Sequence, residues 1–211
     1  MKIFLYLSAL FATLSIHCFA QIHAVTDKGE EVVLSNDGTW KYLNAPQKSY
    51  ETRLDTPLLS KDKHASFLVK GQNVKYGIWI DPKKWKFELN TNESNPSEYI
   101  FTSKDQNIMS LVVAERIEVS TSLLVDAAIK HLRQVAEDVE IIRQETRKVN
   151  GHIVTYLELK GNVKGTKAIY NNYYYTGPTG TIQVICFTSQ NLYQENKKEM
   201  ETFLNGFDLL N

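Results

Sequence analysis

The sequence predicts an α+β protein: a largely antiparallel sheet covered by helices (an α/β/α sandwich), with a small β meander at the N-terminal end. A series of β-favouring segments runs from residue 66 to residue 189, and short turns containing Gly join some of them, as antiparallel neighbours require. Residues 122–136 and 191–204 instead repeat apolar side chains with the helical period. An amphipathic helix buries its apolar stripe, so we expect both helices to lie on the sheet.

Residues 1–20 have the pattern of a secretory signal peptide. A positive start precedes an apolar run at 3–16, and Cys18 and Ala20 place small residues at the −3 and −1 positions of a cleavage site. The run is shorter than the ~20 residues of a transmembrane helix, and it is followed by His17, which disfavours a lipid anchor on Cys18. We expect cleavage after Ala20, a periplasmic or secreted protein, and no stable membrane insertion after cleavage.

Composition and charge exclude several classes of protein. The 211 residues are 43% hydrophobic and carry 24 Lys+Arg against 24 Asp+Glu, which fits a globular protein and gives no reason to expect nucleic acid as a partner. Removal of the signal peptide leaves Cys186 as the only cysteine, so the mature chain has no internal disulfide. Cys186 lies in an apolar strand, and we interpret it as a small buried hydrophobe and not as a reactive thiol.

Residues 21–43 are predicted to form the β meander, and Asp37-Gly38 is a good hairpin turn because Gly accepts a positive φ. Residues 44–64 contain two prolines and many charges without a sustained period, which is typical of a linker. The main domain is then residues 65–211. The β-favouring runs of the meander are 22–26, 31–34 and 39–43.

In the main domain, Asn150-Gly151 and residues 177–180 have the composition of tight turns. Residues 181–189 are apolar at both alternating positions, which predicts a central strand covered on both faces. The expected strands are 66–69, 76–80, 86–90, 99–103, 109–117, 139–149, 152–160, 166–176 and 181–189. The expected inward stripe of the first helix is Leu124, Ala127, Ala128, Leu132 and Val135, and that of the second is Leu192, Asn196, Met200, Phe203 and Leu204.

A short strand followed by Pro82 and Trp85 resembles the opening of domains related to PsbP, the extrinsic protein of photosystem II, and its bacterial relatives. The order of elements over residues 66–209 is similar to theirs. The resemblance implies an antiparallel sheet between helices and a role in binding or assembly. No functional residue of that family matches position by position. Asp37 to Tyr42 separately resembles a short motif of exported bacterial proteins of unknown function.

The sequence contains no known motif of a catalytic or metal site. It lacks Gly-x-Ser-x-Gly, His-Glu-x-x-His and a phosphate loop, so we expect no cofactor, no metal and no catalytic residues. A site assembled from distant residues, such as Cys186 with His152, stays open. The histidines beyond the signal peptide show no metal-ligand spacing; they are His23, His64, His131 and His152.

Four tyrosines on one strand are the candidate binding residues: Tyr170 and Tyr174 share one face, and Tyr173 and Tyr175 share the other. Exposed tyrosines stack on sugars or anchor protein partners, whereas buried ones fill the layer between sheet and helix, which is the commoner outcome. We therefore hypothesise an exported bacterial binding or assembly module without enzymatic activity. Its partner would be an unidentified protein or glycan in the envelope or outside the cell. The alternatives are a secreted hydrolase or a host-directed effector with an unrecognised site.

Overall fold

The computed structural model describes residues 22–25, 31–34, 40–42, 58–92 and 95–210. The chain divides into two units, residues 1–49 and 50–211, which are described separately. In the first unit, strands form where the sequence predicts them and pair antiparallel in the order β1-β2-β3; they are β1 (Ile22–Val25), β2 (Glu31–Leu34) and β3 (Trp40–Tyr42). The signal peptide, the Asp37-Gly38 turn and most of the linker lie outside the described residues.

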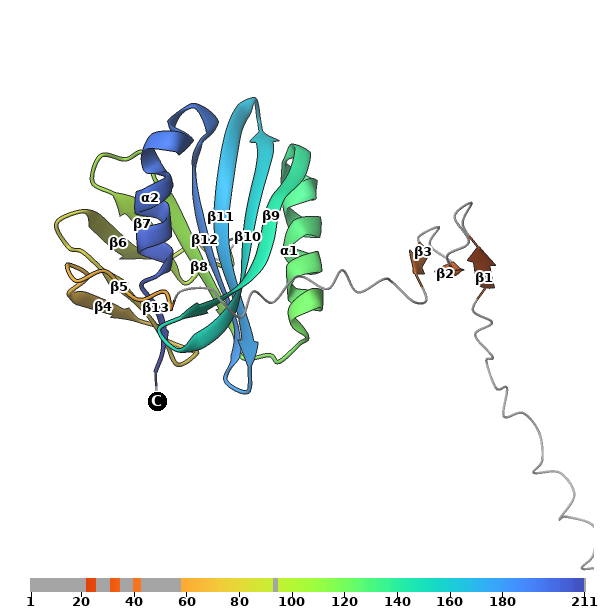
Figure 1. The fold of residues 1–211 in the computed structure, drawn as a ribbon, viewed down its shortest axis with the longest axis horizontal. Coiled ribbons are helices and arrows are strands. Elements are labelled where there is room, and N and C mark those ends of the chain that lie inside the picture. The colour runs from red at the N-terminus through yellow and green to blue at the C-terminus, as the bar shows by residue number, and fades with distance from the viewer. Residues whose placement is uncertain (1–21, 26–30, 35–39, 43–57, 93–94, 211) are drawn as a thin grey trace, which may run out of the picture. The chain divides into compact units, whose positions relative to one another are not determined.

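The described residues of the second unit form two antiparallel sheets and two α-helices (Figure 1). The larger sheet has the order β6-β7-β8-β12-β11-β10-β9, and the smaller has the order β13-β5-β4. The elements are β4 (Phe67–Lys70), β5 (Tyr76–Ile80), β6 (Trp85–Leu89), β7 (Tyr99–Ser103), β8 (Met109–Glu115), α1 (Thr121–Val135), β9 (Glu137–Val149), β10 (His152–Val163), β11 (Thr166–Gly177), β12 (Gly180–Ser189), the 3₁₀ turn η1 (Gln190–Leu192), α2 (Tyr193–Leu204) and β13 (Phe207–Leu209).

This arrangement confirms a mostly antiparallel α+β fold. The strand pairing differs from the prediction: β4 and β5 do not belong to the main sheet and pair instead with β13, a strand of three residues that follows α2. So short a segment carries no readable period in the sequence.

The β9–β10 turn is predicted correctly and also holds other segments in place. Asn150 and Gly151 have φ values of 47° and 91°, the left-handed geometry that favours Asn and Gly. The Asn150 side-chain amide donates to the carbonyls of Asn205 (2.9 Å) and Phe207 (2.7 Å), and its Oδ1 accepts from the Lys61 N–H (3.0 Å). One turn residue therefore ties the large sheet to the C-terminal end of the chain.

The two helices pack on opposite faces of the large sheet. Alternate residues of β12 join different cores: Val184 and Cys186 pack with α2, whereas Ile185 and Phe187 belong to the core of α1. Helix α1 begins with Ser120 as N-cap, whose hydroxyl accepts from the Leu123 N–H at 3.2 Å. It contacts β9 and β11, near one edge of the sheet.

The buried stripe of α1 is rotated from the one that the sequence predicts. Leu124, Val125 and Ile129 are buried, whereas Ala127 and Val135, both expected to face inward, are exposed. Because α1 packs on β9 and β11, the flank that carries Ala127 and Val135 lies beside the uncovered part of the sheet. In α2, four of the five expected residues are buried, and Tyr193 takes the place of Leu192.

Candidate functional site

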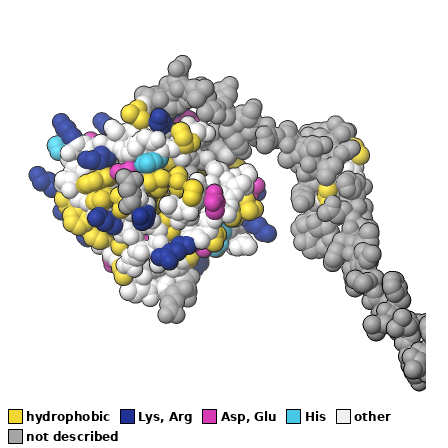
Figure 2. All heavy atoms as spheres, turned by 90° about the horizontal axis from the view of Figure 1, so that it is seen from below, with side chains coloured by type: hydrophobic (Ala, Val, Ile, Leu, Met, Phe, Trp, Pro, Cys, Tyr) yellow, Lys and Arg dark blue, Asp and Glu magenta, His cyan; other side chains and the backbone are white. Residues whose placement is uncertain are grey.

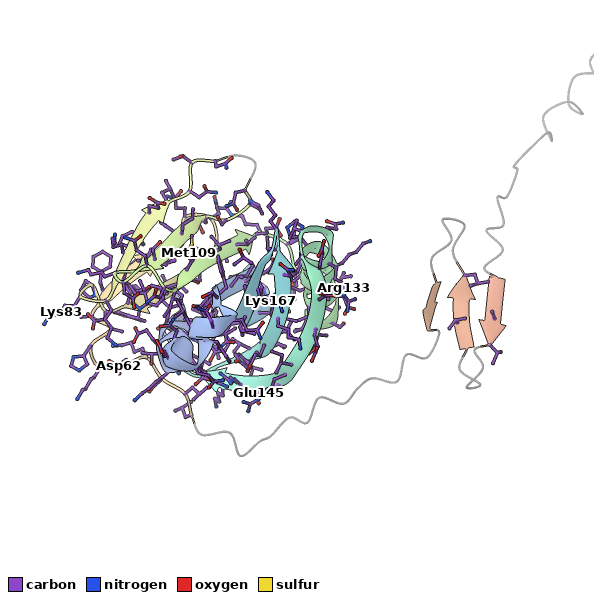
Figure 3. All side chains as sticks on the ribbon, turned by 90° about the horizontal axis from the view of Figure 1, so that it is seen from above. Asp62, Lys83, Met109, Arg133, Glu145 and Lys167 are labelled. Carbon is purple, nitrogen blue, oxygen red and sulfur yellow. The ribbon has the colours of Figure 1, made fainter. Side chains whose placement is uncertain are left out.

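A cleft of about 880 Å³ lies between the flank of α1 and the adjacent face of the large sheet. Its floor is formed by β11, β12 and β8, whose antiparallel register brings three rows of side chains to this face. The rows are Tyr170–Phe187–Met109, Asn172–Ile185–Leu111 and Tyr174–Gln183–Val113. In Figure 3, Met109 on β8 and Arg133 on α1 lie on either side of β11 and β12.

The floor is apolar and partly open to solvent. Met109 is 38% exposed, and Ile185 and Phe187 are half-buried. We expected β12 to be covered on both faces. Its α2 face is covered, but its other face is not, because α1 sits over β9 and β11. Half-exposed apolar side chains in a concave surface are the usual lining of a small-molecule site.

Two buried polar side chains stand in this apolar floor. Asn172 is 3% exposed, and its amide Nδ2 donates to the Tyr174 hydroxyl at 3.0 Å. Its Oδ1 is buried and has no partner among the described residues. Tyr174 is 2% exposed, and burial raises its pKa to about 12, so its hydroxyl keeps the proton at neutral pH. The pair therefore offers a ligand one acceptor, Asn172 Oδ1, and one donor, the Tyr174 O–H.

The cleft contains little charge. Glu115 and His131 are its ionisable lining residues apart from tyrosines, and none of the described residues that line it is Lys or Arg. Gln183, half-buried between Tyr174 and Val113, adds a further neutral polar group.

The structure separates the four candidate tyrosines into two pairs. Tyr170 and Tyr174 line the cleft, and the Tyr170 ring lies 5.5 Å from that of Phe187. Tyr173 and Tyr175 lie on the opposite face, as the strand alternation predicts. Tyr173 is 1% exposed and donates its hydroxyl proton to Asn205 Oδ1 (2.7 Å). The four residues thus do not form one binding surface.

The distant residues that the sequence left open for catalysis have other roles. His152 is paired with Asp208 at 3.2 Å. Cys186 is fully buried on the α2 face, as predicted, and burial raises the pKa of its thiol well above the ordinary value. A protonated, inaccessible thiol is not a nucleophile.

Among the described residues, no group of three His, Cys, Asp or Glu side chains lies close enough to bind a metal ion. Within the same residues, neither helix has the length and apolar character needed to span a bilayer.

Of the residues that line the cleft, the sequence indicated Tyr170 and Tyr174 as candidates, but not Asn172 or Gln183. A signal for Asn172 was present: it is a polar residue at the alternate position between two aromatic residues of a buried strand. The width of the cleft had no sequence signal, because it depends on where α1 settles across the sheet.

Comparison with solved structures supports the fold. The cyanobacterial PsbP protein (CyanoP) from Synechocystis sp. PCC 6803 matches with a TM-score of 0.54 and 14% identity, over 74% of this chain and 95% of that chain. LpqN, involved in cell envelope biogenesis of Mycobacterium tuberculosis, matches with a TM-score of 0.46 and 11% identity, over 69% of this chain and 90% of that chain. A protein of unknown function from Pseudomonas aeruginosa matches with a TM-score of 0.40 and 9% identity, over 64% of this chain and 94% of that chain.

The likeness to the cyanobacterial protein shows a PsbP-like fold, which the order of elements in the sequence predicted, and it shows the fold alone. The two weaker likenesses carry no argument. No family model and no curated protein matches the chain.

Proposed function

We propose that this chain is an exported binding protein without catalytic activity, and that it takes a small apolar molecule into the cleft beside α1. Export is supported by the signal-peptide pattern of residues 1–20. The observation that carries the binding proposal is the cleft itself. Its volume of about 880 Å³ falls within the usual range of small-molecule sites, and its surface is mostly apolar with polar side chains among the lining residues.

An apolar ligand has more support here than the protein or glycan partner that the tyrosines first indicated. Tyr170, Tyr173 and Tyr174 are each at most 9% exposed, so they offer little free ring surface for stacking. The half-exposed apolar side chains lie instead on β8 and β12, beside Ala127 and Val135 of α1.

The hydrophobic effect supplies the binding energy in this proposal. Each methylene buried in the cleft contributes about 0.8 kcal/mol, which is about fourfold in Kd. A homologous series of alkyl ligands should therefore bind progressively more tightly until the chain is longer than the cleft. A protein without an apolar cleft would show no such progression.

Displacement of an apolar fluorescent dye tests the proposal. The purified protein is titrated with the uncharged apolar dye N-phenyl-1-naphthylamine, and decanol is then added as competitor. The variant Ala127→Trp places an indole at the cleft wall, and Leu123→Trp is its matched control, because Leu123 lies on the same helix, is 57% exposed and does not line the cleft.

We expect the wild type and Leu123→Trp to bind the dye alike and to release it to decanol, and Ala127→Trp to bind it at least tenfold more weakly. Equal binding by all three proteins would refute the cleft as the binding site. Because an apolar dye also binds loosely packed states, each variant must first show a cooperative unfolding transition.

A further inference from the structure

The unpartnered Oδ1 of Asn172 points to the chemical class of the ligand. We propose that the cleft binds a neutral single-chain amphiphile, an alkyl or acyl chain that ends in a hydroxyl or primary amide. The polar group binds the Asn172–Tyr174 pair, and the chain lies along β12 and β8. This inference rests on the proposed function and makes it more specific.

Hydrogen bonding favours a head group that both donates and accepts. A buried carbonyl without a partner is unfavourable by about 1–3 kcal/mol, so such groups in native proteins call for an explanation. Asn172 and Tyr174 both line the cleft; Asn172 Oδ1 has no donor among the described residues, and the Tyr174 hydroxyl accepts from Asn172 Nδ2 and has its own proton left to donate. A hydroxyl or primary amide satisfies both because it donates and accepts. A carboxylate only accepts and would leave Oδ1 unsatisfied.

The charge of the lining favours a neutral head group. Glu115 and His131 are the ionisable lining residues besides tyrosines, and no Lys or Arg lines the cleft within the described part of the chain. An anionic head group would lose its hydration without gaining a Lys or Arg partner, which is unfavourable in a buried site. The lining therefore selects a neutral head group over an anionic one.

The length of the cleft fits a single alkyl or acyl chain. Gln183 and Ser189 both line the cleft, and the six steps between them along β12 span about 20 Å at ~3.3 Å per residue. The hydrocarbon core of a bilayer, two acyl chains deep, is about 30 Å thick, so one chain spans about 15 Å. The cleft accommodates one extended chain, with Asn172 and Tyr174 toward the Gln183 end and apolar residues along the rest; these are Leu111, Ile185, Phe187, Met109 and Leu192.

Other surfaces were weaker candidates. Apolar side chains gather between Lys and Arg on the face drawn in Figure 2, but nothing on that face indicates what binds there. A second hollow of about 390 Å³ is lined by Trp79, Trp85 and several charged residues. Its two indole N–H groups already donate hydrogen bonds within the protein, from Trp79 to Asp208 and from Trp85 to Glu199, so they are not free to bind a ligand.

The test compares ligands that share one chain and differ in the head group: decanol, decanamide, decanoate and decyltrimethylammonium, each as competitor for the bound dye. We expect decanol and decanamide to bind at least tenfold more tightly than decanoate and decyltrimethylammonium. In the double variant Asn172→Leu with Tyr174→Phe, decanol should bind about tenfold more weakly and the head-group preference should disappear. The control Tyr173→Phe alters a tyrosine on the opposite face and should keep the preference.

The outcomes separate this inference from the proposed function. If decanoate binds as well as decanol, or if the double variant keeps the preference, the polar anchor is refuted while binding in the cleft stands. If the wild type binds neither the dye nor any of the four ligands, the proposed function fails and the anchor fails with it.

Discussion

Replacing the Asn172–Tyr174 pair by apolar residues should make the unliganded protein more stable. In the double variant Asn172→Leu with Tyr174→Phe, each side chain keeps the branching of the one it replaces, and Asn172 Oδ1, which is buried without a partner among the described residues, is removed. Relief of such a group is worth about 1–3 kcal/mol, and loss of the 3.0 Å hydrogen bond within the pair offsets about 0.5–1.5 kcal/mol. The expected gain in the free energy of unfolding is about 1 kcal/mol, or about 2–4 °C in Tm for a chain of this size.

The two single variants provide the internal controls. Tyr174→Phe leaves the whole Asn172 amide buried without a partner and should lose about 1–3 kcal/mol. Asn172→Leu removes the unpaired oxygen but leaves the Tyr174 O–H unpaired, so it should lie between the single tyrosine variant and the double variant. Urea unfolding followed by circular dichroism gives all four free energies and the coupling energy of the pair.

A loss of more than about 1 kcal/mol in the double variant, with an unchanged m-value, would refute the reasoning. It would mean that Asn172 Oδ1 is satisfied within the protein, and the argument for a ligand donor would then have no basis. If the double variant instead gains stability and loses decanol binding, the pair lowers the stability of the wild type and serves ligand binding, as expected for residues retained for function.

Three further predictions follow from other parts of the structure. Cys186 should resist thiol reagents in native buffer and react only at the rate of global unfolding; fast labelling followed by mass spectrometry would contradict its burial. Because burial raises the pKa of Tyr174 from the ordinary 10.0 to about 12, the unfolded chain ionises first, so the free energy of unfolding should fall as the pH rises from about 10 to about 12. That fall should exceed the fall in Tyr174→Phe by about 3 kcal/mol, and identical pH profiles would exclude the shift. Asn150→Ala should destabilise the fold by about 2–4 kcal/mol, because it removes three hydrogen bonds and places Ala at a φ of 47°. Asn150→Gly also removes the three hydrogen bonds but tolerates the positive φ, so in urea unfolding its free energy of unfolding should fall less than that of Asn150→Ala.

Local patterns were enough to predict most of the fold. The strands around the Asn150-Gly151 turn, the α1 and α2 segments and the buried Cys186 strand follow from alternation, helical period and turn chemistry, which are properties of neighbouring residues. Strand β13 could not be predicted, because its three residues form a strand only through pairing with the distant β5.

The candidate site shows where local patterns stop being informative. Val125 and Ile129 are buried in α1 in place of Ala127 and Val135, and the sequence cannot distinguish these sets because both are apolar at helical spacing. The position of α1 across the sheet selects one set for the core and leaves the other beside the cleft. Asn172 was missed for the same reason: an asparagine in a strand becomes informative only when its neighbours leave Oδ1 without a donor.

The most direct test of cleft binding is a methyl-resolved NMR titration of the purified protein with decanol. Strand β12 carries its own control, since Ile185 faces the cleft while Ile182 and Val184 face the α2 core. We predict saturable shifts at Ile185, Leu111 and Val113, with the methyl groups of Ile182 and Val184 little changed. Larger shifts on the α2 side, or no saturable shift at any methyl group, would contradict binding in the cleft.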